Sequence, residues 1–224
     1  MKWSLLENEK DKAFLDYAKL NHIEDECSFQ GYTLDHILKY YPKNNFRTCI
    51  DVGASYGFLS AGFVKHFESV ESFEASPIVF PMLRLNMKNF SNINLYNVAL
   101  YDKPGLLNFI HEQQSGTSRL LKSYELNKFK NKISVKSRDL DSFKFSNVDL
   151  LKIDVEGSES KVLSGARKTI ESSRPVIFIE MDLRRGSESD SNRRKIMEYF
   201  RSINYVLVDV RFRDFLYIPS EDYL

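Results

Sequence analysis

Apolar and polar residues follow one another along this chain in blocks that predict strands and helices in turn. Between residues 46 and 182, short apolar runs of strand length alternate with amphipathic stretches that have helical spacing. Near-continuous apolar strands separated by helices are typical of a parallel sheet covered on both faces, so the predicted fold class is α/β, doubly wound. The expected strands span residues 46–52, 70–74, 93–100, 106–110, 133–135, 148–153 and 176–179.

Two further strands are expected at the end of the chain, at residues 205–210 and 215–218. Their connection is too short for a parallel crossover, so they must form an antiparallel hairpin. The strand at 106–110 is also expected to pair with its preceding neighbour, through a turn at residues 102–105. The intervening stretch 111–131 has neither periodicity and predicts a long loop beside a site.

Helices are expected between these strands, at residues 59–67, 157–171 and 187–200. A further helix follows the second strand, and its start has two candidates. Ser76 followed by Pro77 is a typical helix start, whereas Pro81 would remove a hydrogen bond if it lay in the interior. The helix therefore begins at Ser76 and bends, or begins at Pro81.

The first 45 residues have a different pattern and predict an N-terminal helical extension before a domain at residues 46–224. Apolar stripes indicate helices at residues 4–20 and 33–41, with a polar loop at 22–31 between them and Pro42 ending the second.

Composition narrows the class of protein. The 224 residues are 42% hydrophobic and carry a net charge of +1, which supports a sizeable core and gives no overall attraction to nucleic acid or anionic membranes. Two cysteines, the absence of an apolar leader and the absence of a run of about 20 apolar residues predict a cytoplasmic protein without a membrane span.

The candidate chemistry centres on the turn after the first strand. Asp51 ends an apolar run, and Gly53 and Gly57 follow before the next amphipathic stretch. Glycine permits unusual dihedral angles and a close approach of a ligand to the backbone. Amides at such a turn have no partner within the helix, so we expect them to face outward and hold a polar ligand.

Acidic residues gather where the predicted strands end, which is where open α/β sheets bind ligands. Each acid has a plainer explanation as a helix cap or as a partner of the turn. Their joint occurrence favours a site. The residues placed at this edge are Asp51, Glu74, Asp154, Glu156, Glu180 and Asp182, with Asn97–Leu100 nearby.

The glycine spacing argues against a dinucleotide. The fingerprint of a dinucleotide site needs three glycines, and this turn has only Gly53 and Gly57 at the required place. Glu74, however, lies 23 residues after Asp51, near the position from which an acid binds a ribose. A nucleoside without a pyrophosphate, such as S-adenosylmethionine (SAM), fits better.

Five blocks, in order, resemble the FkbM family of class I SAM-dependent methyltransferases. The most distinctive is Leu151–Glu159, which reads LKIDVEGSE. The resemblance implies a Rossmann-like, mostly parallel sheet of seven strands with the hairpin at one edge. The other blocks are Asp51–Ser60, Phe73–Pro77 with Asn86, Asn97–Leu100 and Pro175–Glu180.

The resemblance also implies roles for particular residues. Glu74 would bind the ribose hydroxyls of SAM, Asp51 would lie near the amino group of its methionine part, and Asp154 would lie beside the sulfonium. Asn97 and Ala99 would lie near the adenine. The turn residues that would approach the methionine part are Gly53, Ala54, Ser55 and Gly57.

FkbM-like enzymes are associated with O-methylation, often of sugar hydroxyls, so the expected acceptor is a glycan or a small metabolite. Asp154, Glu156 and Glu180 are the candidate catalytic residues, which would orient the acceptor or take its proton. The same three carboxylates could instead hold a hard cation such as Mg²⁺, an alternative that we do not favour.

Two other functions keep the same fold. One is methylation of RNA ribose hydroxyls, and the other is a catalytically silent interaction domain. A dehydrogenase is disfavoured by the missing glycine. Two basic stretches, at residues 122–138 and 184–195, could meet a phosphate-bearing substrate, but they lack the regular aromatic interleaving of a nucleic-acid track.

Overall fold

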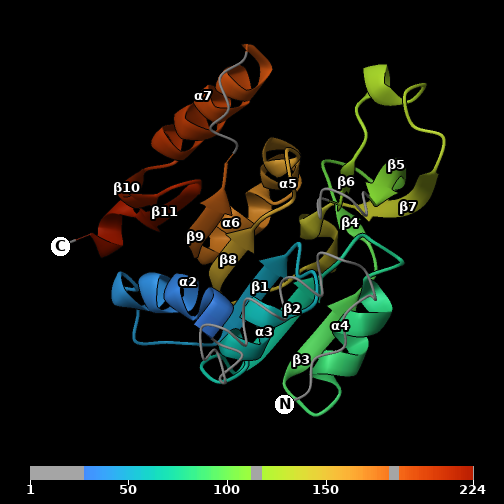
Figure 1. Cartoon of the computed structure of the whole chain (residues 1–224). Helices are drawn as coiled ribbons and strands as arrows, with labels where there is room; N and C mark the ends of the chain where they lie inside the picture. The colour runs from blue at the N-terminus through green and yellow to red at the C-terminus, as the bar shows by residue number, and fades with distance from the viewer. Residues whose placement is uncertain (1–27, 112–117, 182–186, 224) are drawn as a thin grey trace.

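The computed structural model describes residues 28–111, 118–181 and 187–223, and the main sheet is confirmed in them (Figure 1). This sheet has seven strands in the order β10-β11-β9-β8-β1-β2-β3. All neighbouring pairs are parallel except those that involve β11. The strands are β1 (Thr48–Val52), β2 (Ser69–Phe73), β3 (Ile93–Tyr96), β8 (Val148–Ile153), β9 (Val176–Glu180), β10 (Tyr205–Arg211) and β11 (Asp214–Pro219).

Helices cover both faces of the sheet, as the doubly wound prediction requires (Figure 1). One face packs against α2 and α3, and α4 lies beside α3. The opposite face packs against α5, α6 and α7. Alternation along the strands divides the two cores, since Ile50 and Val52 of β1 face one side while Cys49 faces the other. The helices are α2 (Ser28–Lys39), α3 (Phe58–Phe63), α4 (Phe80–Met87), α5 (Glu159–Ser164), α6 (Arg167–Ser173) and α7 (Ser187–Ser202).

The N-terminal prediction is only partly tested. The helix expected at residues 33–41 begins at Ser28, so the predicted loop at 22–31 is wrong from residue 28 onward. Leu34 and Ile37 of α2 are buried against the sheet, which explains why the helix forms there. The helix expected at residues 4–20 lies outside the described residues, and the domain boundary after residue 45 stays a prediction.

The helix that follows β2 begins close to the second of its two predicted starts. Helix α4 begins at Phe80, so Pro81 occupies the first turn, where no intrahelical N–H is required. Ser76 Oγ accepts hydrogen bonds from the amides of Ile78 and Val79 at 3.3 Å each and so stabilises the turn that precedes the helix.

Several boundaries differ from the prediction. The helix expected at 157–171 is two helices, α5 and α6, that meet at Gly165 and Ala166. The strand expected at 93–100 is also divided, because β3 belongs to the main sheet while Ala99 and Leu100 form β4 in another sheet.

This second sheet was not foreseen. It has four strands in the order β4-β7-β5-β6, and its members are β4 (Ala99–Leu100), β5 (Gly105–His111), β6 (Ser118–Leu120) and β7 (Lys132–Arg138). The predicted pairing of 106–110 with its preceding neighbour is wrong, because β7 lies between β4 and β5. Part of the predicted loop at 111–131 is ordered as β6 and the short helix η1 (Ser123–Glu125).

Within the described part of the chain, no helix combines the length and apolarity needed to cross a bilayer.

Gly165, between α5 and α6, packs against the backbone that follows β4, and we expect Gly165→Ala to destabilise the protein. An added Cβ would lie 2.0 Å from the carbonyl oxygen of Tyr101, which follows β4, and backbone cannot yield as a side chain can. The expected loss is about 1–3 kcal/mol, measurable as a lower Tm in thermal unfolding. Gly105→Ala is the control, since its Cβ would meet only Ser137 Oγ at 3.7 Å. Equal Tm values for the two variants would contradict this account.

Candidate functional site

The turn after β1 is shaped by its contact with β8. Gly53 has a φ of +78°, and a Cβ there would lie 1.8 Å from the carbonyl oxygen of Asp154. The Asp154 amide in turn donates to the carbonyl of Val52. Only glycine satisfies both the dihedral angle and this close approach, so the two candidate segments are in backbone contact at the carboxyl ends of adjacent strands.

The amides of this turn do not face outward as expected. Gly53 and Ala54 both donate to the carbonyl of Phe73, and Gly57 donates to the carbonyl of Ala54. The amide of Ser55 donates to the Glu74 carboxylate at 2.9 Å. The expectation that the turn's amides face outward is therefore wrong for these four, while the approach of these residues to a ligand stays a prediction.

Glu74 is placed by these same contacts. Its two carboxylate oxygens accept one amide each, from Ser55 at 2.9 Å and from Ser76 at 2.7 Å. The residue is 7% exposed, and burial raises the pKa of its carboxyl while the two amides oppose this. Each oxygen keeps a further lone pair, so the carboxylate can still accept from two neighbouring hydroxyl groups.

Asp51 was expected near the amino group of a bound SAM, but its side chain is buried inside the protein. It is fully buried, its Oδ2 accepts from the hydroxyl of Ser60 at 2.6 Å, and its Oδ1 forms an ion pair with Lys152 Nζ at 3.0 Å. Strand register brings these side chains together, because Asp51 of β1 lies opposite Ser72 of β2 on one side and Lys152 of β8 on the other. The three residues form a buried row across the sheet. Asp51 therefore supports the turn, and a direct contact with a ligand stays a prediction.

Lys152 is a site residue that the sequence analysis missed. Its Nζ donates to the carbonyl of Gly53 at 2.8 Å and of Val52 at 3.3 Å, and it lies 4.0 Å from Asp154 Oδ2. Nearby carboxylates, Asp51 above all, outweigh burial and raise the pKa of Lys152, so the side chain stays charged. The available signal was the presence of Lys152, the single basic residue, in the mostly apolar strand 148–153.

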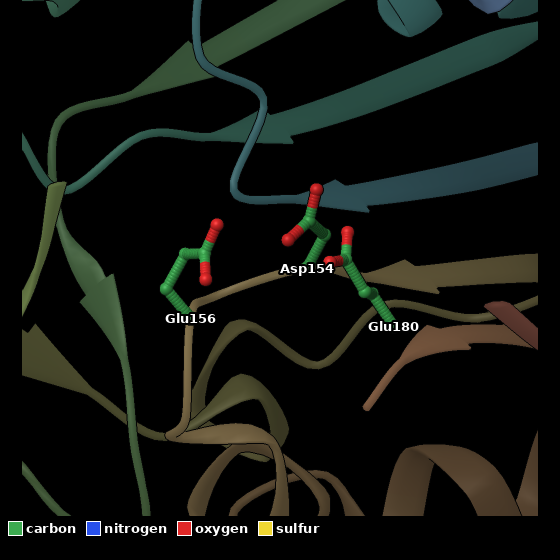
Figure 2. A group of neighbouring side chains, drawn as sticks. All are labelled: Asp154, Glu156 and Glu180. Carbon is green, nitrogen blue, oxygen red and sulfur yellow. The ribbon is translucent and has the colours of Figure 1, made fainter. Parts of the chain in front are cut away.

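The three predicted catalytic acids come together (Figure 2). One carboxylate oxygen from each of Asp154, Glu156 and Glu180 lies within 4.8 Å of the others. Asp154 follows β8, Glu180 ends β9, and Glu156 lies in the connection to α5 with a positive φ of 52°. All three are partly exposed, so the cluster is open to a ligand.

A cation from the C-terminal hairpin contacts this cluster. Arg213, in the β10–β11 connection, places Nη2 3.0 Å from Glu180 and 3.3 Å from Glu156. Converging carboxylates could also suit a hard cation, but two of these acids already have the guanidinium as a partner.

Burial and nearby negative charges raise the pKa values of two carboxyl groups at this site. Burial, with Asp154 nearby, raises the pKa of Glu180 to about 8, and the same two causes raise the pKa of Asp214 to about 6. Arg213 lowers both pKa values but does not cancel these effects. The site therefore contains a carboxyl group that titrates near neutral pH, which is suited to proton transfer.

Of the remaining predicted residues, Asp182 lies outside the described residues, and the others contact parts of the chain other than the acid cluster. Asn97 uses its amide nitrogen to hold the carbonyls of Glu74 and Ala75, at 2.8 and 3.3 Å. Ala99 is buried with Phe109 in the core of the second sheet, and Ala54 is buried against α4. Their roles toward a ligand stay predictions.

A large cleft begins at this edge of the molecule. Its volume is about 980 Å³, and it lies between the β8–α5 connection, the β6–η1 segment and helix α7. Glu156 is the member of the acid cluster that lines it. Polar and aromatic side chains form much of the remaining wall, among them Tyr101, Tyr124, Ser158, Ser160 and Asn192.

Comparisons with known proteins agree with this geometry. Residues 51–207 match the family model described as the methyltransferase FkbM domain. The 2-O-methyltransferase NoeI of Sinorhizobium fredii (strain NBRC 101917 / NGR234) is 25% identical over 176 residues, which are 70% of this chain and 72% of that protein.

A solved structure, methyltransferase FkbM from Methylobacillus flagellatus KT, matches with a TM-score of 0.56 at 21% sequence identity. The match covers 78% of this chain and 43% of that one, so this chain spans less than half the length of that relative. At this identity the likeness establishes the shared fold.

Glu159, at the start of α5, provides a test of the electrostatics. Burial raises its pKa to about 7, so the native state keeps a proton that the unfolded state loses above pH 4.5. Stability is therefore expected to fall as the pH rises from 4.5 to 7. Glu159→Gln should remove this penalty, which is on the order of 2–3 kcal/mol in the free energy of unfolding at pH 8. The Tm should therefore rise at pH 8 but not at pH 4.

The exposed Glu171→Gln, on α6, is the matched control and should leave the Tm unchanged at both pH values. If Glu159→Gln lowered the Tm at pH 8, the carboxylate would be a net stabilising partner and the assignment would be wrong.

Proposed function

Because the chain belongs to the FkbM family of SAM-dependent methyltransferases, we propose that it methylates a hydroxyl oxygen of a sugar, in a glycan or a small metabolite. The observation that carries this proposal is the convergence of Asp154, Glu156 and Glu180 beside a large polar cleft. An oxygen acceptor needs a group that positions it and takes its proton, and carboxylates can do both.

The residues at the ends of β1 and β2 fit SAM. Glu74 is oriented by two amides and retains acceptor capacity for a pair of ribose hydroxyls, and the close contact of Gly53 with Asp154 holds the turn beside it. The carboxylate of Asp154 at the end of β8 complements a positive charge. When bound, SAM would supply an electrophilic methyl group on a positively charged sulfur.

Glu180 is the proposed general base. Its raised pKa places it near the pH at which it must accept a proton from the acceptor hydroxyl, at one of its carboxylate oxygens. Arg213 and the partly exposed Glu156 would fix the direction of that carboxylate and of the acceptor. Asp154, held between Lys152 and the turn, would orient the reacting groups without leaving its place.

The lining of the cleft supports a carbohydrate acceptor. Tyrosine rings such as Tyr101 and the 59% exposed Tyr124 offer flat apolar faces, and the surrounding hydroxyl and amide groups can bond to sugar hydroxyls. This combination of faces and polar groups suits a sugar better than an apolar metabolite. The curated relative is, by its name, an O-methyltransferase, which supports oxygen as the acceptor atom.

We expect Glu74→Ala to weaken SAM binding by at least about tenfold in isothermal calorimetry, because the pair of ribose hydroxyls would lose its acceptor. Glu71→Gln is the control. Glu71 is also a buried acid of β2, but it bonds Ser69, Asn94 and Tyr96, away from the turn. Binding of NAD in place of SAM, or equal SAM affinity in Glu74→Ala and the wild type, would contradict the proposed donor site.

Methyl transfer should depend on the ionisation of Glu180. With tritiated SAM and a saccharide mixture, we expect the rate to rise with pH and to level off above about pH 8, because the base must be unprotonated. Glu180→Gln should lower kcat by about 10²- to 10⁴-fold and flatten this rise. Asp209→Asn, on β10, is the control and should keep both the rate and the profile.

Two other outcomes would redirect the assignment. Loss of activity in EDTA with recovery in Mg²⁺ would give the acid cluster a metal-binding role. Transfer to RNA but to no saccharide would replace the proposed acceptor class.

A further inference from the structure

Positive charge is concentrated in one segment of this nearly neutral chain. Residues 118–138 contain seven Lys and Arg residues and a single acid, Glu125, whereas the whole chain has a net charge of +1. This segment forms β6, η1 and β7 of the second sheet. The main sheet, with the proposed donor site, therefore lies beside a strongly basic structural element.

The basic segment forms one wall of the cleft. Lys122 and Tyr124 line it, and the ammonium groups of Lys122 and Lys128 lie 6.0 and 5.6 Å from the centre of the exposed Tyr124 ring. An aromatic ring with two lysines nearby can stack on a sugar ring while the ammonium groups pair with an acidic substituent.

The facing walls add further cations. Lys161 of α5 and Lys195 of α7 line the same cleft, as does Arg193. Lys161 pairs with Asp102 at 2.7 Å, whereas Lys195 is exposed and has no acidic partner in the described ranges. Five cations line the cleft, and three of them have an acidic partner: Arg119 pairs with Glu125, Lys161 with Asp102 and Arg193 with Asp190.

The acids that line the cleft do not neutralise its positive charge equally at both ends. Glu125 is held by a bidentate pair with Arg119, at 2.7 and 2.8 Å. Glu159 is buried, and its pKa of about 7 leaves it partly protonated at neutral pH. Glu156 remains, at the end of the cleft that joins the acid cluster. The cleft is therefore polarised, with acids at the reacting end and lysines at η1 and α7.

We propose that this cleft binds an anionic saccharide, a sugar that carries a phosphate, sulfate or carboxylate group. The inference rests on the proposed O-methylation and specifies its substrate class. The negative substituent lies at the lysine-rich wall around Tyr124, and the hydroxyl to be methylated lies at Glu156 and Glu180. The charge polarity of the cleft thus determines which end of the acceptor reaches the donor.

Binding can be tested apart from turnover. The full chain, saturated with S-adenosylhomocysteine, is titrated in a calorimeter with UDP-glucose, tetragalacturonate and a heparin tetrasaccharide, which carry diphosphate, carboxylate and sulfate groups. Chitotetraose is the neutral probe. We expect at least one charged probe to bind about tenfold or more tightly than chitotetraose, with an affinity that falls as salt rises. The probe that binds best identifies the source of the charge.

Substitutions in the wall around Tyr124 test whether the charged probe binds there. The double variant Lys122→Gln/Lys128→Gln should weaken the best charged probe by about tenfold and leave chitotetraose unchanged, and Tyr124→Ala should weaken both probes. The control Lys88→Gln/Lys168→Gln removes the same charge from two exposed lysines that do not line the cleft, one directly after α4 and one in α6, and it should have no effect. Equal Tm values establish that all variants fold.

The outcomes separate the two proposals. Equal affinity for charged and neutral probes, no binding of any charged probe, or tighter binding of a 12-nucleotide RNA would each overturn the anionic-saccharide assignment. If a charged probe binds at this wall and no saccharide is ever methylated, the proposed reaction fails while the binding site stands. If only neutral sugars are methylated, the proposed reaction stands and the anionic-saccharide assignment fails.

Discussion

The ion pair of Asp51 with Lys152 is the interaction on which the rest of the site depends. It joins the two central parallel strands, β1 and β8, in the buried row that also contains Ser72. Lys152 also holds the carbonyls of Val52 and Gly53, so one ammonium group fixes the end of β1 and the start of the glycine turn. Removing either charge would leave the other buried and unpaired, a cost of roughly 3–5 kcal/mol.

This pair explains why the donor side of the site is rigid. The turn at Gly53 presses against the backbone of Asp154, and its amides fold onto Phe73 and Glu74. The cleft belongs to different elements, since β6, η1, α5 and α7 supply most of its lining. The groups proposed to bind the donor and the acceptor are thus held by separate parts of the chain.

The sequence predicted the main sheet well because its strands carry their own signal. The strand at 148–153 matches β8 at both ends, because its four apolar residues form a short run of strand length between Asn147 and Asp154. The glycine turn and the three converging acids were also predicted, because the carboxyl ends of parallel strands meet at one edge.

The failures involve partners that are distant in the sequence. Nothing local shows that β7 separates β4 from β5, or that the turn amides bond to Phe73 and Glu74. The break between α5 and α6 follows from the close contact of Gly165 with Tyr101, which a helical periodicity does not reveal. Lys152 was overlooked because a buried charge is recognisable only once its partner Asp51 is placed beside it.

Arg213 has a consequence for the order in which the molecule is completed during synthesis. The acids of the cluster precede it in the chain by at least 33 residues, and the counter-ion comes from the last hairpin of the main sheet. Before this hairpin is made, the three carboxylates have no guanidinium partner, and their mutual repulsion disfavours ionisation of all three at once. The charge balance of this edge is therefore complete only when β11 pairs with β9.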